Sequence, residues 1–143
     1  MTIRLPVSAP FHLEATVRVL QRRNSNLIDT WQHRRYCRVI NLGDKPTLIE
    51  VDDRGTVDAP NLRLTIRRPD DVDGALNARG RAEAARIASH ILGLGVDTSV
   101  PRQRAEADPA LRATALALRG LRPPRYPDLF ETFTNVKIGR AHV

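Results

Sequence analysis

Few residues of this sequence have the types and spacing that chemistry at a site requires. The four histidines share no metal-ligand spacing with one another or with Cys37, the only cysteine, so we expect no metal site, no disulfide and no cofactor. The pairs Asp52-Asp53 and Asp70-Asp71 could be imagined as an acid pair for proton transfer. Adjacent carboxylates at a turn are solvated, so we interpret both pairs as turn and cap residues.

An aromatic and basic segment lies at residues 31–36, which read Trp-Gln-His-Arg-Arg-Tyr. Rings beside cations are the ingredients of a surface on which nucleic-acid bases stack. The tip of a β-hairpin with ordinary sheet aromatics accounts for the same residues, and we favour that interpretation.

The charge of the chain also suggests a partner that carries phosphate. The net charge is +7 and the isoelectric point is near 10.9, and each phosphate that a cation neutralises adds sequence-independent affinity. Of the 23 basic residues, however, only Lys45 and Lys137 are lysine. Such an excess of arginine also arises from a GC-rich coding sequence, so the charge alone leaves both explanations open.

Length and hydropathy limit the class of protein. A chain of 143 residues accommodates one domain and part of a second, and 41% hydrophobic residues permit a core. No apolar run approaches the roughly 18 to 20 residues of a membrane span, and the first residues lack a signal-peptide apolar block. We therefore expect a cytoplasmic protein that does not associate with a membrane. We also expect it to be a monomer.

The first two thirds of the chain alternate between helical and strand periodicity. Apolar residues repeat every two positions in the predicted strands, which turn-forming residues separate, and every three or four in the predicted helices. An antiparallel meander is the simplest connection between the later strands. The strands are expected at residues 2–7, 36–40, 48–51 and 62–66, and the helices at 12–23 and 79–92.

Beyond residue 98 the pattern is helical only. Asp108-Pro109 predicts the start of one helix and Asp128 the start of another, while residues 121–127, rich in proline, predict an extended loop. The fold class is therefore α+β: an antiparallel sheet with two helices, followed by the start of an all-α domain. We expect a first domain at 1–96 and an incomplete helical domain at 97–137.

The last six residues do not fit the pattern of the predicted last helix. Residues 138–143, Ile-Gly-Arg-Ala-His-Val, are similar to a translated sequencing adapter, and we expect that they do not continue the helix that Asp128 begins. A natural tail is the alternative.

Two stretches resemble a known family. Residues 10–14 with 20–23, and above all residues 120–131, Gly-Leu-Arg-Pro-Pro-Arg-Tyr-Pro-Asp-Leu-Phe-Glu, resemble the helix-hairpin-helix DNA glycosylases of the bacterial 3-methyladenine DNA glycosylase II type. The resemblance covers residues 1–137 and implies an opening domain like half of the TATA-binding fold. It also implies that Arg122, Arg125 and Tyr126, whose loop leads into the DNA-facing helix, lie near DNA. A linker that packs Tyr126 and Pro127 on the core is the alternative.

The resemblance implies base-excision repair of double-stranded DNA. Such enzymes flip an alkylated purine into a pocket and hydrolyse its N-glycosidic bond, with an aspartate stabilising the cationic sugar. The family's hairpin and aspartate come later than residue 137, so we expect this fragment to be inactive and to contain no catalytic residue. Residues 91–95 resemble the hairpin's glycine pattern, but a helix end explains those glycines better. A non-catalytic basic nucleic-acid-binding module and a structural or interaction domain remain the alternatives.

Overall fold

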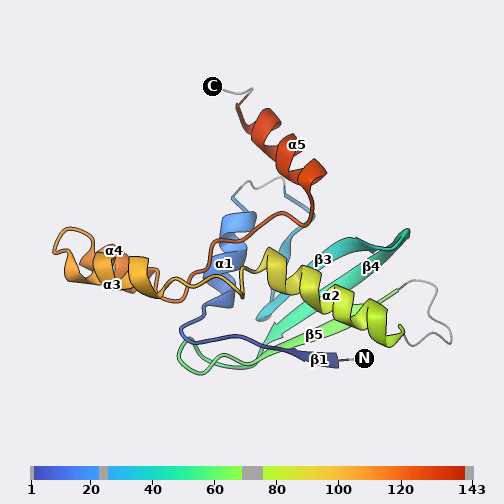
Figure 1. The fold of residues 1–143 in the computed structure, drawn as a ribbon, viewed down its shortest axis with the longest axis horizontal. Coiled ribbons are helices and arrows are strands. Elements are labelled where there is room, and N and C mark those ends of the chain that lie inside the picture. Colours follow the sequence, from blue (N-terminus) through green and yellow to red (C-terminus); the bar gives the residue numbers. More distant parts are fainter. Residues whose placement is uncertain (1, 23–25, 69–75, 141–143) are drawn as a thin grey trace.

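The computed structural model describes residues 2–22, 26–68 and 76–140, and contains one antiparallel sheet and five helices within those ranges (Figure 1). The strand order across the sheet is β1-β5-β4-β3-β2. The strands are β1 (Thr2–Leu5), β2 (Thr30–Gln32), β3 (Arg35–Leu42), β4 (Lys45–Asp53) and β5 (Leu62–Arg67). The helices are α1 (Leu13–Leu20), α2 (Ala78–Ile91), α3 (Ser99–Ala107), α4 (Arg112–Ala117) and α5 (Leu129–Arg140).

The sheet has one apolar face and one polar face, as the two-residue periodicity predicts. In β3 the even-numbered residues from Tyr36 to Leu42 are buried, while the odd-numbered ones are exposed or half-buried. The register places Val51 and Leu64 on the same buried face, beside Tyr36. Each fully buried aliphatic side chain contributes about 1.5–3 kcal/mol, so this face stabilises the whole sheet.

Two helices pack against the apolar face. α1 buries Leu13 and Val17, and α2 buries Ala84, Ala88 and Ile91, all in one core cluster with the sheet residues. The small alanines let the backbone of α2 approach the sheet closely, and α2 crosses the face where it contacts β1, β3 and β5 (Figure 1). The predicted α+β class, an antiparallel sheet with two helices, is therefore confirmed.

Strand β2 was not among the strands expected at stated positions, although the favoured β-hairpin at residues 31–36 implies a strand before its turn. It has three residues, too few for a period of two to be recognised, and it joins β3 through a turn at His33 and Arg34 with φ values of 49° and 61°. Tyr36 is fully buried and Trp31 packs against the core. The aromatic residues of this segment are therefore hairpin residues of the sheet, as favoured, and their rings do not form an exposed stacking surface.

The helix ends follow local hydrogen bonding. Asn77, and not the Asp70-Asp71 pair, caps α2: its side chain accepts the N–H of Gly80 at 2.8 Å. Asp70-Asp71 lies outside the described residues. Asp108 accepts the N–H of Ala110 at 2.8 Å, but a turn follows and α4 begins only at Arg112.

Helix α5 corrects one expectation about the end of the chain. Asp128 caps it, as predicted, by accepting the N–H of Glu131 at 2.7 Å. The helix then continues to Arg140, so the first three residues of the suspected tail are helical and do not interrupt it. Helical backbone at residues 138–140 does not reveal where the sequence comes from, so the adapter-like origin of residues 138–143 stays a prediction.

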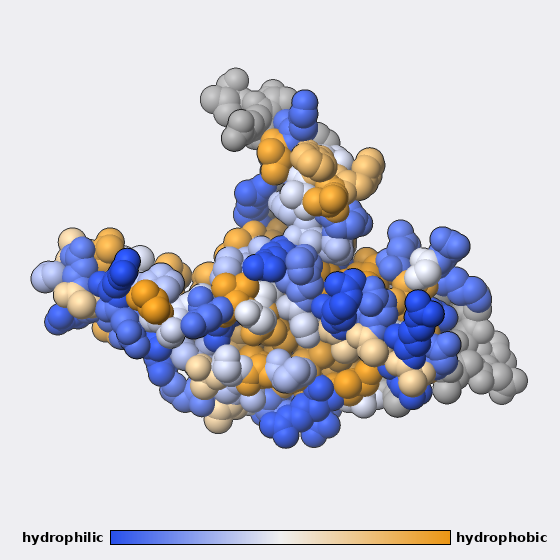
Figure 2. All heavy atoms as spheres, in the orientation of Figure 1, coloured by the Kyte–Doolittle hydropathy of each residue, from blue (hydrophilic) through white to orange (hydrophobic). Residues whose placement is uncertain are grey.

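Apolar side chains remain exposed on the later helices. α5 projects away from the sheet and carries the C-terminus, and apolar groups cover part of its visible surface (Figures 1 and 2). Phe130 is 82% exposed and Phe133 64%, and Leu111 and Leu118 around α4 are half exposed. Within the described ranges, no helix is both long and apolar enough to cross a membrane.

Candidate nucleic-acid interface around the linker

The segment from residue 121 to residue 128, called the linker below, returns from α4 to the sheet and its two helices. Just before it, the carbonyl of Gly120 accepts the N–H of His12 at 2.7 Å. The N–H of Arg122 then donates to the hydroxyl of Thr16 at 3.1 Å, and the N–H of Arg125 donates to the carbonyl of Ile91 at 2.9 Å. These bonds attach the linker to both α1 and the end of α2, although its proline content prevents regular structure.

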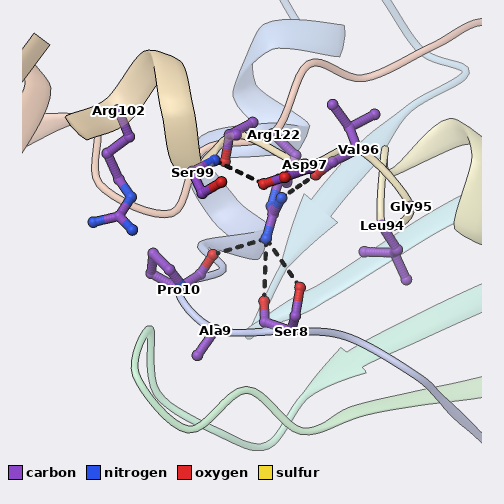
Figure 3. Close-up of a pocket in the computed structure, with 11 residues that line it drawn as sticks. Ser8, Ala9, Pro10, Leu94, Gly95, Val96, Asp97, Ser99, Arg102 and Arg122 are labelled. Carbon is purple, nitrogen blue, oxygen red and sulfur yellow. Dashed lines mark hydrogen bonds between the residues drawn. The ribbon is translucent and has the colours of Figure 1, made fainter. Parts of the chain in front are cut away.

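Arg122 is buried, with only 4% of its surface exposed. Its Nη2 donates to the carbonyl of Ser8 at 3.2 Å, to the hydroxyl of Ser8 at 3.3 Å and to the carbonyl of Pro10 at 3.4 Å. Its Nη1 donates to the carbonyl of Val96, and Figure 3 shows the guanidinium between these groups. Arg122 therefore ties together the loop after β1, the loop after α2 and the linker. These hydrogen bonds leave little of the Arg122 guanidinium free to contact a phosphate.

A cavity of about 350 Å³ lies beside the Arg122 guanidinium, between the loop after β1 and the start of α3. Asp97 lines it, and its carboxylate accepts the N–H of Ser99 at 2.8 Å (Figure 3). That hydrogen bond, together with the Arg122 charge, lowers the pKa of Asp97 below its ordinary value. Arg102, which also lines the cavity, pairs with Glu106 within α3 at 3.2 Å. The charged groups that the structure shows around this cavity thus have structural partners and do not form a nucleophile and base pair.

Gly93 permits the close approach of the linker to the end of α2. Its φ is +63°, and a Cβ at this position would lie 2.6 Å from the carbonyl oxygen of Pro123. Its N–H donates to the carbonyl of His90 at 3.1 Å, immediately after the cap residue Leu92. The interpretation of Gly93 as a helix end is therefore confirmed, whereas Gly95 has neither positive φ nor a crowded Cβ position.

The two remaining linker candidates are more accessible. The side chain of Arg125 is exposed, and Tyr126 is half-buried beside a cavity of about 200 Å³ that Asp29, Glu131 and Asn135 also line. The structure therefore separates the three predicted residues: Arg122 points into the protein and Arg125 lies on its surface. Contact of Arg125 and Tyr126 with DNA stays a prediction.

A buried charged cluster joins α5 to the sheet. Arg38 of β3 is 3% exposed; its Nη1 donates to Asp29 at 2.9 Å, and its Nη2 donates to Glu131. The hydroxyl of Tyr36 donates to the same Asp29 oxygen at 2.7 Å. Burial alone would lower the pKa of Arg38, but the hydrogen bond to Glu131 and the Asp29 charge outweigh it and raise that pKa. Burial, followed by the Asp29 charge, also raises the pKa of Tyr36 well above its ordinary value.

This cluster was not predicted from the sequence. The signal in the sequence is an arginine at a core-facing position of a strand. Arg38 lies two residues after Tyr36 and two before Ile40, so all three are on the same buried face. A buried cation requires a partner, and the two partners come from residues 9 positions before it and 93 positions after it. Only the fold brings those carboxylates together.

The other candidate residues have structural roles. Asp52 accepts from Arg35 at 2.6 Å and Asp53 from Arg34 at 2.8 Å, so this pair is held by arginines at the end of β4, and Asp53 also accepts the Gly55 N–H in the turn that follows. Within residues 2–22, 26–68 and 76–140, no group of three or more histidine, cysteine, aspartate or glutamate side chains is arranged to hold a metal ion.

Comparison with known proteins shows which solved structure has a similar fold. No protein-family model and no curated protein matches the sequence. Among solved structures, the chain is similar to a 3-methyladenine DNA glycosylase from Archaeoglobus fulgidus, with a TM-score of 0.72 and 13% sequence identity. The similarity covers 99% of this chain and 45% of that chain. The chain thus shares the fold of a little less than half of that glycosylase.

Proposed function

We propose that this chain is the N-terminal part of a base-excision-repair DNA glycosylase that flips alkylated purines out of duplex DNA and hydrolyses their N-glycosidic bonds. The observation that carries the proposal is the shared fold with a 3-methyladenine DNA glycosylase over 99% of the chain. The proline-rich linker and the helix that Asp128 caps, on which the sequence resemblance rests, lie within that shared region.

In this proposal the chain supplies the scaffold and part of the DNA-facing surface. The sheet with α1 and α2 is a rigid base, the linker is hydrogen-bonded to it, and the Arg38 cluster sets where α5 begins. Exposed Arg125 would neutralise a phosphate, and half-buried Tyr126 would lie beside it. The aspartate that stabilises the sugar cation would come from residues that follow this part of the protein, so the chain by itself would not excise bases.

An excision assay tests the proposal. A duplex containing one alkylated purine is incubated with this chain and, separately, with the protein encoded by the gene when it is read further downstream. We expect the longer protein to release the damaged base and leave undamaged purines in place, and this chain to release nothing. Release of the base by this chain would contradict the proposal that the catalytic aspartate lies outside it. Failure of the longer protein to release any alkylated base would contradict the proposed function.

A binding module without chemistry is the second candidate, because the net charge of +7 suits phosphate contact without any lesion. Its signature is equal affinity for damaged and undamaged duplex together with no excision by the longer protein. Lesion-dependent excision by the longer protein rejects this candidate.

A further inference from the structure

The face of the sheet that turns away from α1 and α2 carries a row of arginines, called the arginine row below. It consists of Arg4, Arg63, Asp52 and Arg35, which are register partners on the neighbouring strands β1, β5, β4 and β3. The row therefore has three cations and one carboxylate. Successive strands lie about 4.8 Å apart, so the row extends about 14 Å across the sheet.

The carboxylates on this face are already paired at one side of it. Asp52 accepts from Arg35 at 2.6 Å, and Glu50 accepts from Arg67 at 2.6 Å and from Arg35 at 3.4 Å. Neither carboxylate has a bond to Arg63, although Asp52 is its register partner. The negative charge of the outer face is therefore concentrated on β4. Arg35 of β3 and Arg67 at the end of β5 neutralise it.

Among the described residues, Arg4 and Arg63 have no carboxylate partner. Within the part of the chain that the structure describes, neither side chain has an ion pair, and the Nε of Arg63 is buried with no hydrogen-bond acceptor. The two residues are direct cross-strand partners, whose Cβ atoms lie about 5 Å apart in such a pair, and like charges in this position destabilise a sheet. An anion between the two guanidinium groups would remove that repulsion.

We propose that the arginine row binds the phosphate backbone of duplex DNA, with Arg4 and Arg63 as the principal contacts; this rests on the proposed function only in taking DNA as the partner. The row suits phosphates because its cations outnumber its carboxylates. It suits a duplex in preference to a single strand because its residues include no aromatic ring on which an unpaired base could stack, Tyr36 being on the opposite, buried face. Over about 14 Å, duplex DNA presents about eight phosphates, enough for both arginines to find one.

This surface is distinct from the linker. Arg4 lies near the beginning of the chain on an edge strand, and Arg125 follows α4 and hydrogen-bonds through its backbone to the end of α2. The arginine row reads no base and would hold undamaged duplex as well as damaged duplex. It would thus add affinity that does not depend on a lesion.

The salt dependence of binding to a short undamaged duplex tests the proposal. Each phosphate contact contributes about 0.9 to the slope of log affinity against log salt, so the double variant Arg4→Gln and Arg63→Gln should lower the magnitude of the slope by about 1.8. The matched control is Arg18→Gln with Arg86→Gln, which removes the same charge from exposed arginines that are paired with Glu14 and Glu83 on α1 and α2. The control should change the slope by much less.

Equal changes in the two double variants would overturn the proposal, because they would show a response to net charge alone. An unchanged slope in the Arg4 and Arg63 variant would also overturn it, while excision by the longer protein would leave the proposed function standing. Circular dichroism checks that the variants fold. The single variant Arg4→Gln, on the exposed edge strand, should lower the slope by about 0.9 and provides the test should the double variant be unstable.

Discussion

The guanidinium of Arg38 donates a hydrogen bond to the carboxylate of Glu131, 93 positions later in the chain, and so joins the middle of β3 to the first turn of α5. The same guanidinium binds Asp29 at 2.9 Å. Because Phe130 and Phe133 on α5 are exposed, apolar packing of these two rings does not attach the start of that helix to the sheet. The Arg38–Glu131 hydrogen bond makes this attachment instead. A charged hydrogen bond depends on direction, whereas apolar packing does not.

Loss of either partner of this contact should destabilise the protein, but unequally. Arg38→Met leaves two carboxylates without their cation, one of them buried, and should lower the free energy of unfolding by about 3–5 kcal/mol. Glu131→Gln keeps an acceptor and leaves Arg38 its bond to Asp29, so about 1 kcal/mol is expected. Urea unfolding measures both. Amide hydrogen exchange in Glu131→Gln should be faster than in the unchanged protein in the first turn of α5, and the same in the sheet. Exchange rates in that turn that do not differ between the two proteins would contradict the role of Glu131.

Arg122 should matter for stability and Arg125 should not. Arg122→Lys places one ammonium where a planar fork of donors now reaches Ser8, Pro10 and Val96, so some buried carbonyls lose their donor. We expect a loss of about 2 kcal/mol or more in urea unfolding. The matched variant Arg125→Lys, at an exposed side chain of the same loop, should change stability by less than about 0.5 kcal/mol. Similar values for the two variants would show that Arg122 does not tie the loops together.

Two glycines provide a test of the linker's approach to α2. Gly93→Ala forces a Cβ to 2.6 Å from the carbonyl oxygen of Pro123 at a φ of +63°, and should destabilise the protein by more than about 1 kcal/mol. Gly95→Ala meets nothing within 4 Å and should have an effect within about 0.5 kcal/mol of zero. Thermal unfolding of the two variants side by side measures the difference. A tolerated alanine at position 93 would mean that the linker moves away easily.

The thiol of Cys37 should ionise at higher pH than an ordinary cysteine. Burial, and next the negative charge of Glu50, raise its pKa. A raised thiol pKa contributes stability below the ordinary value, near 8.5, and this contribution is lost as the pH rises through the raised pKa. Alkylation by iodoacetamide should therefore be slower at pH 8 in the folded protein than in the same chain unfolded in urea. The pH profile of the rate should shift upwards on folding, and a downward shift would contradict the assignment.

Local sequence determined most of the architecture. Alternation in β3 to β5, the helical repeats of α1 and α2, the prolines of the linker and the cap at Asp128 each act within a few residues, so they can be recognised without a fold. The same local rules failed where the element is too short for its repeat to be recognised, as in the three residues of β2. They also failed at Asp108, where a turn precedes α4 and the helix begins only at Arg112.

The tertiary structure alone decided which polar residues meet. Arg122 and Arg125 stand three positions apart in one proline-rich loop and look equivalent in the sequence, yet one is buried among carbonyls from two other loops and the other is exposed. Arg38 hydrogen-bonds to Glu131, and Arg4 lies opposite Arg63 on the neighbouring strand. Both pairs are separated in the sequence by distances that no periodic pattern predicts. Local propensity acts through the backbone of neighbouring residues, whereas burial and charge pairing depend on distances in space, which exist only once the sheet and its helices have packed.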